Sequence, residues 1–204
     1  MPTRLLLVRH GETEWHAENR YAGSSEVGLT ERGLRQAHEL AAVLETMPGP
    51  PAALYCSPQE RARITAEPSA RALGLTPTVL PDLREVHFGI AEGRTLDEVR
   101  GTDPDAVRRF LADPVAGAFP GAEPPAAAAD RAAAALRSIA GNEAGPVLVV
   151  AHNTLLRLTL CLLLGIPLHT YRTVFPRLEN CALTEIGIDG ERTSLRRLNA
   201  PTPG

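Results

Sequence analysis

Apolar and polar residues follow two patterns along this chain. Short, continuous apolar runs occur at 5–8, within an expected strand at 3–8, and at 53–56 and 147–151, and such runs are typical of strands buried on both faces. Stretches with an apolar residue at every third or fourth position, such as 33–46, indicate helices that cover those strands. The alternation predicts an α/β fold, with three α/β/α layers around a mostly parallel central sheet.

Residues with special backbone preferences predict where the helices begin and end. Thr30 is the expected N-cap of a first helix that ends near Thr46, and Ser57 with Pro58 is the expected start of a second. Pro68 lies inside the second helical pattern, where a kink or break is expected. Four further elements are predicted: a weak strand at 76–80, helices at 125–140 and 154–164, and a hairpin pairing 182–188 with 194–198.

Length, charge and hydropathy exclude several classes of protein. The 204 residues, 44% of them hydrophobic, are enough for one core, and we expect a single domain over residues 1–204. A net charge of −3 does not favour nucleic acid or an anionic membrane as a partner. No apolar run has the length of a membrane span, and the N-terminus does not resemble a secretory signal. We expect a cytoplasmic protein, with a homodimer left open.

The cysteine and lysine content limits which metal sites and catalytic mechanisms are expected. Cys56, Cys161 and Cys181 lie in apolar stretches and form no CxxC pair, so reduced core thiols are expected and a zinc site is not. All 21 basic residues are arginine, which excludes lysine Schiff-base chemistry and the lysine of a GxxxxGK loop. Every fixed cation is therefore a guanidinium, whose fork fits phosphate or carboxylate oxygens.

Two predicted strands end on a histidine. The first strand runs directly into Arg9-His10, and the strand over 147–151 runs into His152. A third strand is followed by a helix whose first turn contains Arg61. Because ligands of open α/β sheets bind outside the carboxyl ends of the strands, we expect these residues to converge. Two histidines, two arginines and a helix N-terminus would make a site suited to a phosphate dianion.

The order of the motifs resembles that of the histidine phosphatase superfamily, the phosphoglycerate mutase-like proteins. RHGETEW, LTERGLRQA, SPQERARITA, LREVHFGIAEG and VLVVAHNTLLR follow one another as in that superfamily, over nearly the whole chain. The resemblance implies a phosphoglycerate mutase-like fold. It also implies hydrolysis of a phosphomonoester through a phosphohistidine intermediate, with a small phosphorylated metabolite as substrate and with neither metal nor other cofactor.

The resemblance also implies roles for single residues. His10 matches the histidine that becomes phosphorylated, and His152 matches a second histidine that contacts the phosphoryl group. Arg9 and Arg61 match the arginines that clamp that group, and Glu85 matches the acid/base carboxylate. Physical chemistry agrees, because neutral imidazole is a competent nucleophile and neighbouring cations favour its neutral form. A carboxyl group can protonate a leaving alkoxide and later deprotonate water.

Further phosphate-binding positions depart in part from the superfamily pattern. His16 stands where members often have asparagine, and it too can donate a hydrogen bond. Tyr21 and Gly23 belong to the stretch RYAG, which stands where members have Arg-Phe-Ser/Cys-Gly. Asn153 replaces the usual glycine after the second histidine. Gly11 and Gly23 are expected to let the backbone approach the phosphate.

The same comparison favours a phosphatase over a mutase. Mutases of the superfamily have a Glu-Arg-His-Tyr-Gly block and a downstream lysine, whereas this chain has EVHFG at 85–89 and no lysine. The run PGAE at 120–123 instead resembles the Pro-Gly-Gly-Glu of family phosphatases. Two alternatives stay open, namely a cofactor-dependent phosphoglycerate mutase and a non-catalytic protein that binds a phosphorylated ligand.

The leaving-group pocket is expected between segments 19–29 and 95–125. Sugar phosphates, phosphoglycerate derivatives, nucleotides and phosphate esters of cofactor pathways all stay open as substrates. The candidate contacts are Arg20, Tyr21, Arg94, Arg108 and Arg109.

Overall fold

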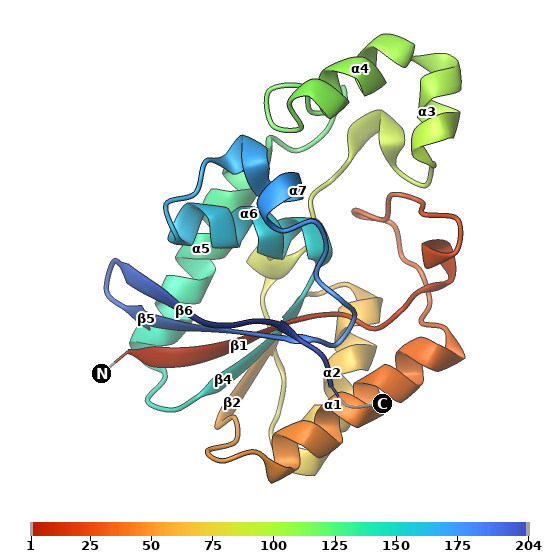
Figure 1. Cartoon of the computed structure of the whole chain (residues 1–204). Helices are drawn as coiled ribbons and strands as arrows, with labels where there is room; N and C mark the ends of the chain where they lie inside the picture. The colour runs from red at the N-terminus through yellow and green to blue at the C-terminus, as the bar shows by residue number, and fades with distance from the viewer. Residues whose placement is uncertain (1, 203–204) are drawn as a thin grey trace.

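A six-stranded sheet forms the centre of the computed structural model, which describes residues 2–202 (Figure 1). The strands lie in the order β3-β2-β4-β1-β5-β6. β1, β2, β3 and β4 run parallel, and β5 runs antiparallel to both of its neighbours, which confirms the mostly parallel sheet. The bounds are β1 Thr3–Arg9, β2 Ala53–Cys56, β3 Thr78–Val79, β4 Val147–Ala151, β5 Leu183–Asp189 and β6 Arg192–Ala200.

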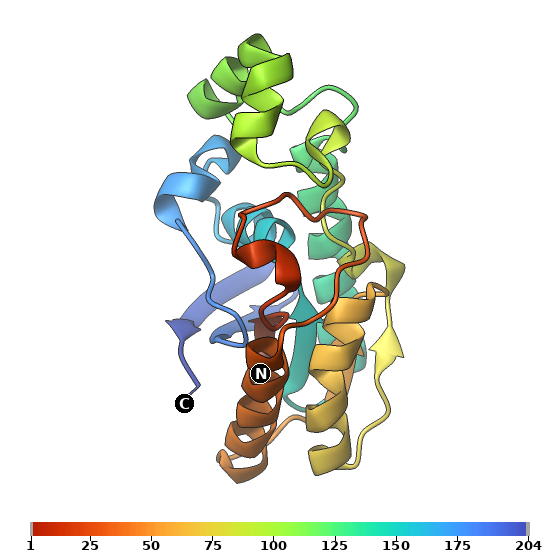
Figure 2. The same cartoon turned by 90° about the vertical axis from the view of Figure 1, so that its right-hand side faces the viewer.

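Helices cover both faces of the sheet, which confirms the three-layer architecture (Figures 1 and 2). One face carries α1 (Glu31–Thr46) and α2 (Glu60–Leu73), and the other carries α5 (Pro125–Asn142) and α6 (Asn153–Leu163). Among the described residues, no helix has the length and apolar character needed to cross a membrane. Three shorter helices, α3 (Leu96–Thr102), α4 (Pro104–Ala112) and α7 (Tyr171–Val174), lie beyond these layers.

The side chains of β1 alternate between two hydrophobic cores. Leu5 and Leu7 pack in the core that contains α5 and α6, whereas Leu6 and Val8 pack in the core beneath α1 and α2. Successive side chains of a strand point to opposite faces of its sheet. A strand covered on both faces therefore needs an apolar residue at every position, and this explains the continuous runs in the sequence.

The two predicted N-caps differ in their outcome. Thr30 caps α1 as expected, because its Oγ1 accepts a hydrogen bond from the Gly33 N–H. Ser57 was the wrong start for α2, which begins at Glu60 with Gln59 as its N-cap. The Ser57 hydroxyl is engaged elsewhere, since its Oγ lies 2.7 Å from a ring nitrogen of His152.

Pro68 does not break α2. The helix runs through it without interruption, so the predicted break is wrong. Ala62 and Ala66 precede the proline, Ala70 follows it, and all three are buried in the core beneath α1 and α2. Burial of this face holds the helix on both sides of the missing N–H, so tertiary packing outweighs the local cost of the proline.

The chain changes direction between β1 and β4, and this creates a gap at the edge of the sheet. The two strands are adjacent and in register, with Arg9 opposite Ala151. After β1 the chain crosses to α1 on one face, and after β4 it crosses to α6 on the other. In open α/β sheets such a switch point is where ligands bind.

Gly11 and Gly33 let the loop after β1 lie against the first turn of α1. A Cβ atom on Gly33 would stand 2.1 Å from the backbone oxygen of Glu12, and one on Gly11 would stand 2.6 Å from the backbone oxygen of Gly33. Real Cβ atoms do not approach backbone so closely, so a side chain at either position would push the loop away from the helix.

We predict that Gly33→Ala lowers the free energy of unfolding by about 1–3 kcal/mol, because the added methyl group overpacks a backbone contact. Denaturant unfolding of the purified variant measures this change. Gly141→Ala is the matched control, since its Cβ would meet nothing within 4 Å and a helical alanine is favoured over glycine by about 0.5–1 kcal/mol. Equal stability of the two variants would contradict the packing argument.

Candidate active site

A cavity of about 500 Å³ opens at the carboxyl ends of β1 and β4. It collects residues from the loop after β1, the Glu85 loop, the first turn of α6 and the segment 172–177. Arg61, His152 and Gly23 are not part of the lining, and the first two are fully buried. Six of the predicted catalytic and phosphate-binding residues do line it: Arg9, His10, His16, Tyr21, Glu85 and Asn153.

His10 is held by backbone groups in one ring orientation. The backbone N–H of His10 donates to the backbone oxygen of Ala151, and the ring atom Nδ1 lies 2.8 Å from the backbone oxygen of Gly11. A nitrogen that faces a carbonyl must carry the proton, so the neutral ring has its lone pair on Nε2. Burial, together with Arg61 and Arg9, lowers the pKa of His10 well below its ordinary value. The Nε2 atom is therefore available as a nucleophile.

His152 lies beside His10 at the start of α6. The two ring centroids are 5.2 Å apart, and His152 Nε2 lies 2.7 Å from Ser57 Oγ. Burial lowers the pKa of His152 as well, and Arg61 and His10 act in the same direction. Its Nδ1 is buried and has no hydrogen-bond partner among the residues of 2–202.

Arg9 and His16 are joined by a short hydrogen bond. Arg9 Nη1 donates to the backbone oxygen of Leu178, and its Nη2 lies 2.5 Å from His16 Nε2. A guanidinium group can only donate, so His16 Nε2 is the acceptor, and the ring proton lies on Nδ1, 2.8 Å from Thr13 Oγ1. Burial and then Arg9 lower the pKa of His16 to about 4, so the ring is neutral at pH 7. The neutral ring therefore leaves the positive charge of Arg9 uncancelled.

Arg61 is held by carbonyl oxygens rather than by carboxylates. Its Nη1 donates to Ser25 O at 2.8 Å, and its Nη2 donates to Ala22 O and Gly23 O at 3.0 and 2.9 Å. In the described part of the chain the buried Nε atoms of both Arg61 and Arg9 have no partner. Among the described residues, both guanidinium groups are consequently satisfied by carbonyl dipoles, with no direct ion pair to a carboxylate.

Gly23 packs against the Glu85 loop instead of facing the cavity. A Cβ atom there would stand 2.0 Å from Glu92 Oε1 and 2.3 Å from the backbone oxygen of Val86. Its carbonyl accepts from Arg61 and from Gln59 Nε2. The absence of a side chain on this glycine therefore allows the contact between two loops.

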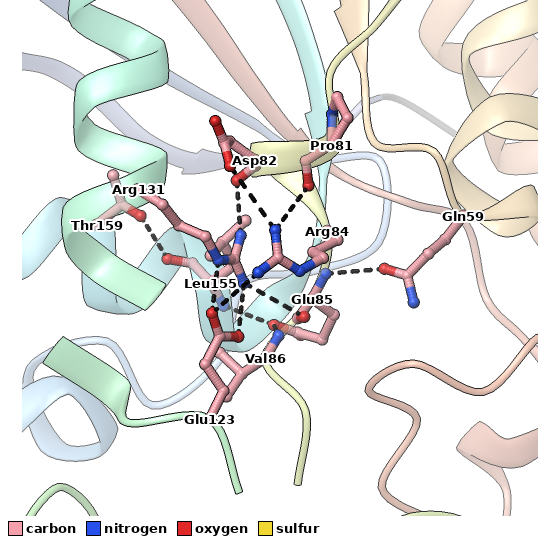
Figure 3. Close-up of polar contacts among 10 residues, drawn as sticks. All are labelled: Gln59, Pro81, Asp82, Arg84, Glu85, Val86, Glu123, Arg131, Leu155 and Thr159. Carbon is pink, nitrogen blue, oxygen red and sulfur yellow. Dashed lines mark hydrogen bonds and ion pairs between the residues drawn. The ribbon is translucent and has the colours of Figure 1, made fainter. Parts of the chain in front are cut away.

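Glu85 lies in a loop, with its carboxylate at the N-terminus of α6. Oε1 accepts from the N–H groups of Val86 and Leu155 at 2.9 and 2.8 Å (Figure 3). Oε2 accepts from the Thr154 N–H at 3.0 Å. The N–H groups of a first helical turn have no partner within their own helix, so they are free for this task. Burial raises the pKa of Glu85, although these N–H groups and Arg61 oppose the rise. Oε2, which accepts only one of these bonds, is the oxygen better able to carry a proton.

Tyr21 and Asn153 line the cavity, but each side chain also makes contacts within the protein. The Tyr21 ring packs 4.9 Å from that of Phe88 and belongs to an aromatic cluster with Phe110 and Phe119. Asn153 Oδ1 accepts from the backbone N–H of Leu178. Within this cluster, Tyr21 and Phe88 line the cavity and give it an apolar side.

Most of the arginines expected around the leaving group bond elsewhere. Arg20 lines the cavity, but its guanidinium forms a two-pronged pair with Glu98 at 2.7 and 2.9 Å. Arg94 bonds to Thr102, and Arg108 pairs with Asp105 at 2.7 Å. Partners close in sequence or in space therefore occupy the guanidinium groups of these side chains.

Sequence reasoning missed several residues of the cavity. Arg172 and Arg177 come from the segment after α6, and Arg172 stacks over the Phe110 ring at 4.9 Å from its centroid. That segment has no motif or periodicity that points to it. Gln59 does not line the cavity but accepts from the Glu85 N–H; it was also missed, although it stands in the quoted motif SPQERARITA. Within residues 2–202, no group of three or more His, Cys, Asp or Glu side chains is arranged to hold a metal ion.

Known proteins of similar sequence match nearly the whole chain. A bifunctional protein of Mycobacterium tuberculosis is 38% identical over 199 residues, which are 97% of this chain and 54% of that protein. The chain thus spans about half the length of that relative. A protein of Yersinia pestis named probable phosphoglycerate mutase GpmB is 34% identical over 184 residues, covering 90% of this chain and 84% of that protein.

Solved structures of two phosphatases also resemble this chain over nearly its whole length. The alpha-ribazole phosphatase of Shigella flexneri is 27% identical with a TM-score of 0.86, over 99% of this chain and 98% of that one. A mycobacterial glucosyl-3-phosphoglycerate phosphatase is 26% identical with a TM-score of 0.87, over 98% of this chain and all of that one. The profile of the histidine phosphatase superfamily, branch 1, matches residues 5–201. Residues 5–201 include the strand ends that carry His10 and His152, and the chain belongs to the histidine phosphatase superfamily.

Proposed function

We propose that the chain is a phosphomonoester hydrolase, which moves a phosphoryl group from a small phosphorylated metabolite to His10 and then to water. The observation that carries the proposal is the neutral His10 ring, with Nδ1 held by a carbonyl and Nε2 free, beside the guanidinium group of Arg9 and that of the fully buried Arg61. Two similar structures are named phosphatases, and this supports the same reaction class.

The reaction has two displacements at phosphorus. In the first, His10 Nε2 attacks the phosphorus atom in line, the bond from phosphorus to the ester oxygen breaks, and Glu85 Oε2 gives its proton to the leaving oxygen. In the second, the Glu85 carboxylate takes a proton from water as its oxygen attacks the phosphohistidine. The P–N bond then breaks, inorganic phosphate leaves, and both residues return to their initial states.

Arginines and neutral donors stabilise the charge on the equatorial oxygens in this scheme. Arg9, with His16 beside it, binds one side of the phosphoryl group, and Arg61 and His152 supply their unpartnered nitrogens on another. Because these groups supply fixed positive charge, the proposed reaction needs no metal ion and no other cofactor. Asn153 stays a proposed contact from the first turn of α6.

Hydrolysis is favoured over the mutase reaction that the name of the Yersinia relative suggests. A mutase must retain a carboxylated intermediate while it turns. The position that would carry an arginine is Val86, which is buried in the core, and Phe88 lines the cavity without a hydroxyl group. The absence of lysine removes a further cation. A binding protein without turnover is disfavoured, because all five proposed catalytic residues, Arg9, His10, Arg61, Glu85 and His152, are present.

A cavity of about 500 Å³ suits a metabolite better than a macromolecule. We therefore propose a small-molecule partner, and neither nucleic acid nor a membrane. The three cysteines are free and buried, as in the reducing cytoplasm that we propose for the protein.

We predict that substrate labelled in its phosphate transfers the label to His10, where it is stable to base and labile to acid. Rapid quenching followed by peptide mapping detects the adduct, and His10→Ala abolishes it. The labelling is repeated after dialysis against a strong chelator and is expected to be unchanged. Label on another residue, or a requirement for added magnesium or zinc, would contradict the proposed chemistry.

We predict that Glu85→Gln slows phosphorylation of His10 by about a hundred- to ten-thousandfold with glycerol phosphate, and far less with nitrophenyl phosphate. The alkoxide leaving group is strongly basic and needs a proton, whereas nitrophenolate leaves nearly unaided. Single-turnover rapid-quench rates measure the step directly. Arg61→Ala is the control, since it is expected to slow both substrates alike, and equal losses in Glu85→Gln would rule out a leaving-group role.

We predict that the ligand-free protein loses stability as the pH falls from 7 to 5, partly because of His10. Its pKa is lower in the folded state than in the unfolded state. Below about pH 6.5 the unfolded chain therefore takes up a proton that the folded protein refuses. Each such histidine contributes up to about 1.4 kcal/mol per pH unit. Denaturant unfolding of His10→Asn is expected to show a shallower pH slope than the parent, and identical slopes would show that His10 is protonated in the fold.

A further inference from the structure

Glu85 owes its position to side chains from other parts of the chain. It lies in a loop between the short helical turns at 81–83 and 89–91, so no helix or strand fixes its backbone. Its N–H donates to Gln59 Oε1 at 2.8 Å, and its backbone oxygen lies 3.4 Å from Arg131 Nη2, the donor (Figure 3). A general acid must be held to within a fraction of an ångström of its productive place, so these contacts bear on the reaction.

Arg131 reaches the Glu85 loop from α5 and uses all three of its guanidinium nitrogens. Nη1 donates to the backbone oxygen of Asp82 at 2.6 Å. Nε and Nη2 donate to the two carboxylate oxygens of Glu123 at 2.7 and 2.8 Å, a two-pronged pair that is nearly buried (Figure 3). The exposed fractions of the two side chains are 11% and 16%. This geometry fixes the guanidinium plane, and lysine has no equivalent of it.

Glu123 ties the same arginine to the far side of the loop. Its backbone N–H donates to the backbone oxygen of His87 at 2.9 Å, and the neighbouring Ala122 forms a β-bridge with Phe88. Arg131 therefore binds the loop at Asp82 and Glu85. Glu123, its ion-pair partner, binds the same loop at His87. The carboxyl group of Glu85 projects from between these points toward α6.

The ion pair also matters electrostatically. An unpaired arginine beside Glu85 would favour the carboxylate and so work against a proton donor. Although burial disfavours charge on Glu123, the hydrogen bond and charge of Arg131 hold its pKa below the ordinary value. Glu123 is thus ionised at neutral pH and neutralises Arg131, which can bind the loop without adding net charge.

We propose that Arg131, held by Glu123, is a positioning residue that places Glu85 for proton transfer to the leaving group. The proposal rests on the hydrolase function proposed above. It assigns no contact with substrate to either residue, since neither lines the cavity. It follows that Arg131 accelerates the phosphorylation of His10 only through Glu85.

The test compares Arg131→Gln with Arg84→Gln. Arg84 also reaches Glu123, at 3.4 Å, and the backbone oxygen of Pro81, but it is 47% exposed and makes no bond to Glu85. Phosphorylation of His10 is measured by rapid quench with glycerol phosphate and with nitrophenyl phosphate. We expect Arg131→Gln to slow the glycerol phosphate reaction by about ten- to a hundredfold and the nitrophenyl phosphate reaction by less than about threefold. Arg84→Gln is expected to stay within about twofold of the parent for both.

The same pair of rates is then measured in the Glu85→Gln background. There Arg131→Gln is expected to have no further effect, because the two residues act as one unit. A loss that persists in this background, or one that is equal for both substrates, would overturn the proposal. If Arg131→Gln does not fold, as judged by its unfolding transition, Glu123→Gln replaces it with the same expected substrate split. A parent protein that never labels His10 would instead overturn the hydrolase function, and the positioning role with it.

Discussion

The parallel pairing of β1 with β4 is the constraint on which the rest of the site depends. Its register sets Arg9 opposite Ala151, so the residues that follow, His10 and His152, leave the sheet at the same level. The bond from the His10 N–H to Ala151 O continues the ladder one step beyond β1 and fixes the nucleophile's backbone. A slip of one residue would turn the apolar run of β1 over and exchange its two buried faces. Core packing and the placement of the two histidines are therefore one requirement.

Electrostatics imposes the second requirement, which is to bury cations without cancelling them. The guanidinium groups of Arg9 and Arg61 end on backbone oxygens, supplied by Leu178 and by the loop 22–25. Carbonyl dipoles satisfy their N–H groups and leave the net charge in place. Burial, together with that charge, holds the neighbouring histidines neutral, as their lowered pKa values indicate. A carboxylate in the place of those oxygens would have weakened both the attraction for phosphate and the preference for a neutral ring.

Much of this arrangement could be predicted from the sequence, for identifiable reasons. The strands at 53–56 and 147–151 have the predicted bounds, because a strand buried on both faces leaves a continuous apolar run. The predictions at Pro68 and Ser57 were wrong because tertiary contacts outweigh local preferences. A buried alanine face holds the helix around Pro68, and the His152 ring binds the Ser57 hydroxyl. Arg131 could not be singled out at all. Its partners lie at Asp82, Glu85 and Glu123, and only the packing of α5 beside the Glu85 loop brings them together.

The first turn of α6 serves two residues at once, since His152 is its N-cap and its free N–H groups hold the Glu85 carboxylate. A shift of this helix would move both groups together and keep their mutual geometry. The wall of the cavity, by contrast, comes from α7, the segment after it and the aromatic cluster that reaches α4. Changes in these outer elements can reshape the room for a leaving group while the chemistry stays intact. The fold thereby separates what is done to the phosphate from the choice of the molecule that bears it, and new substrates can be acquired in evolution without rebuilding the reaction centre.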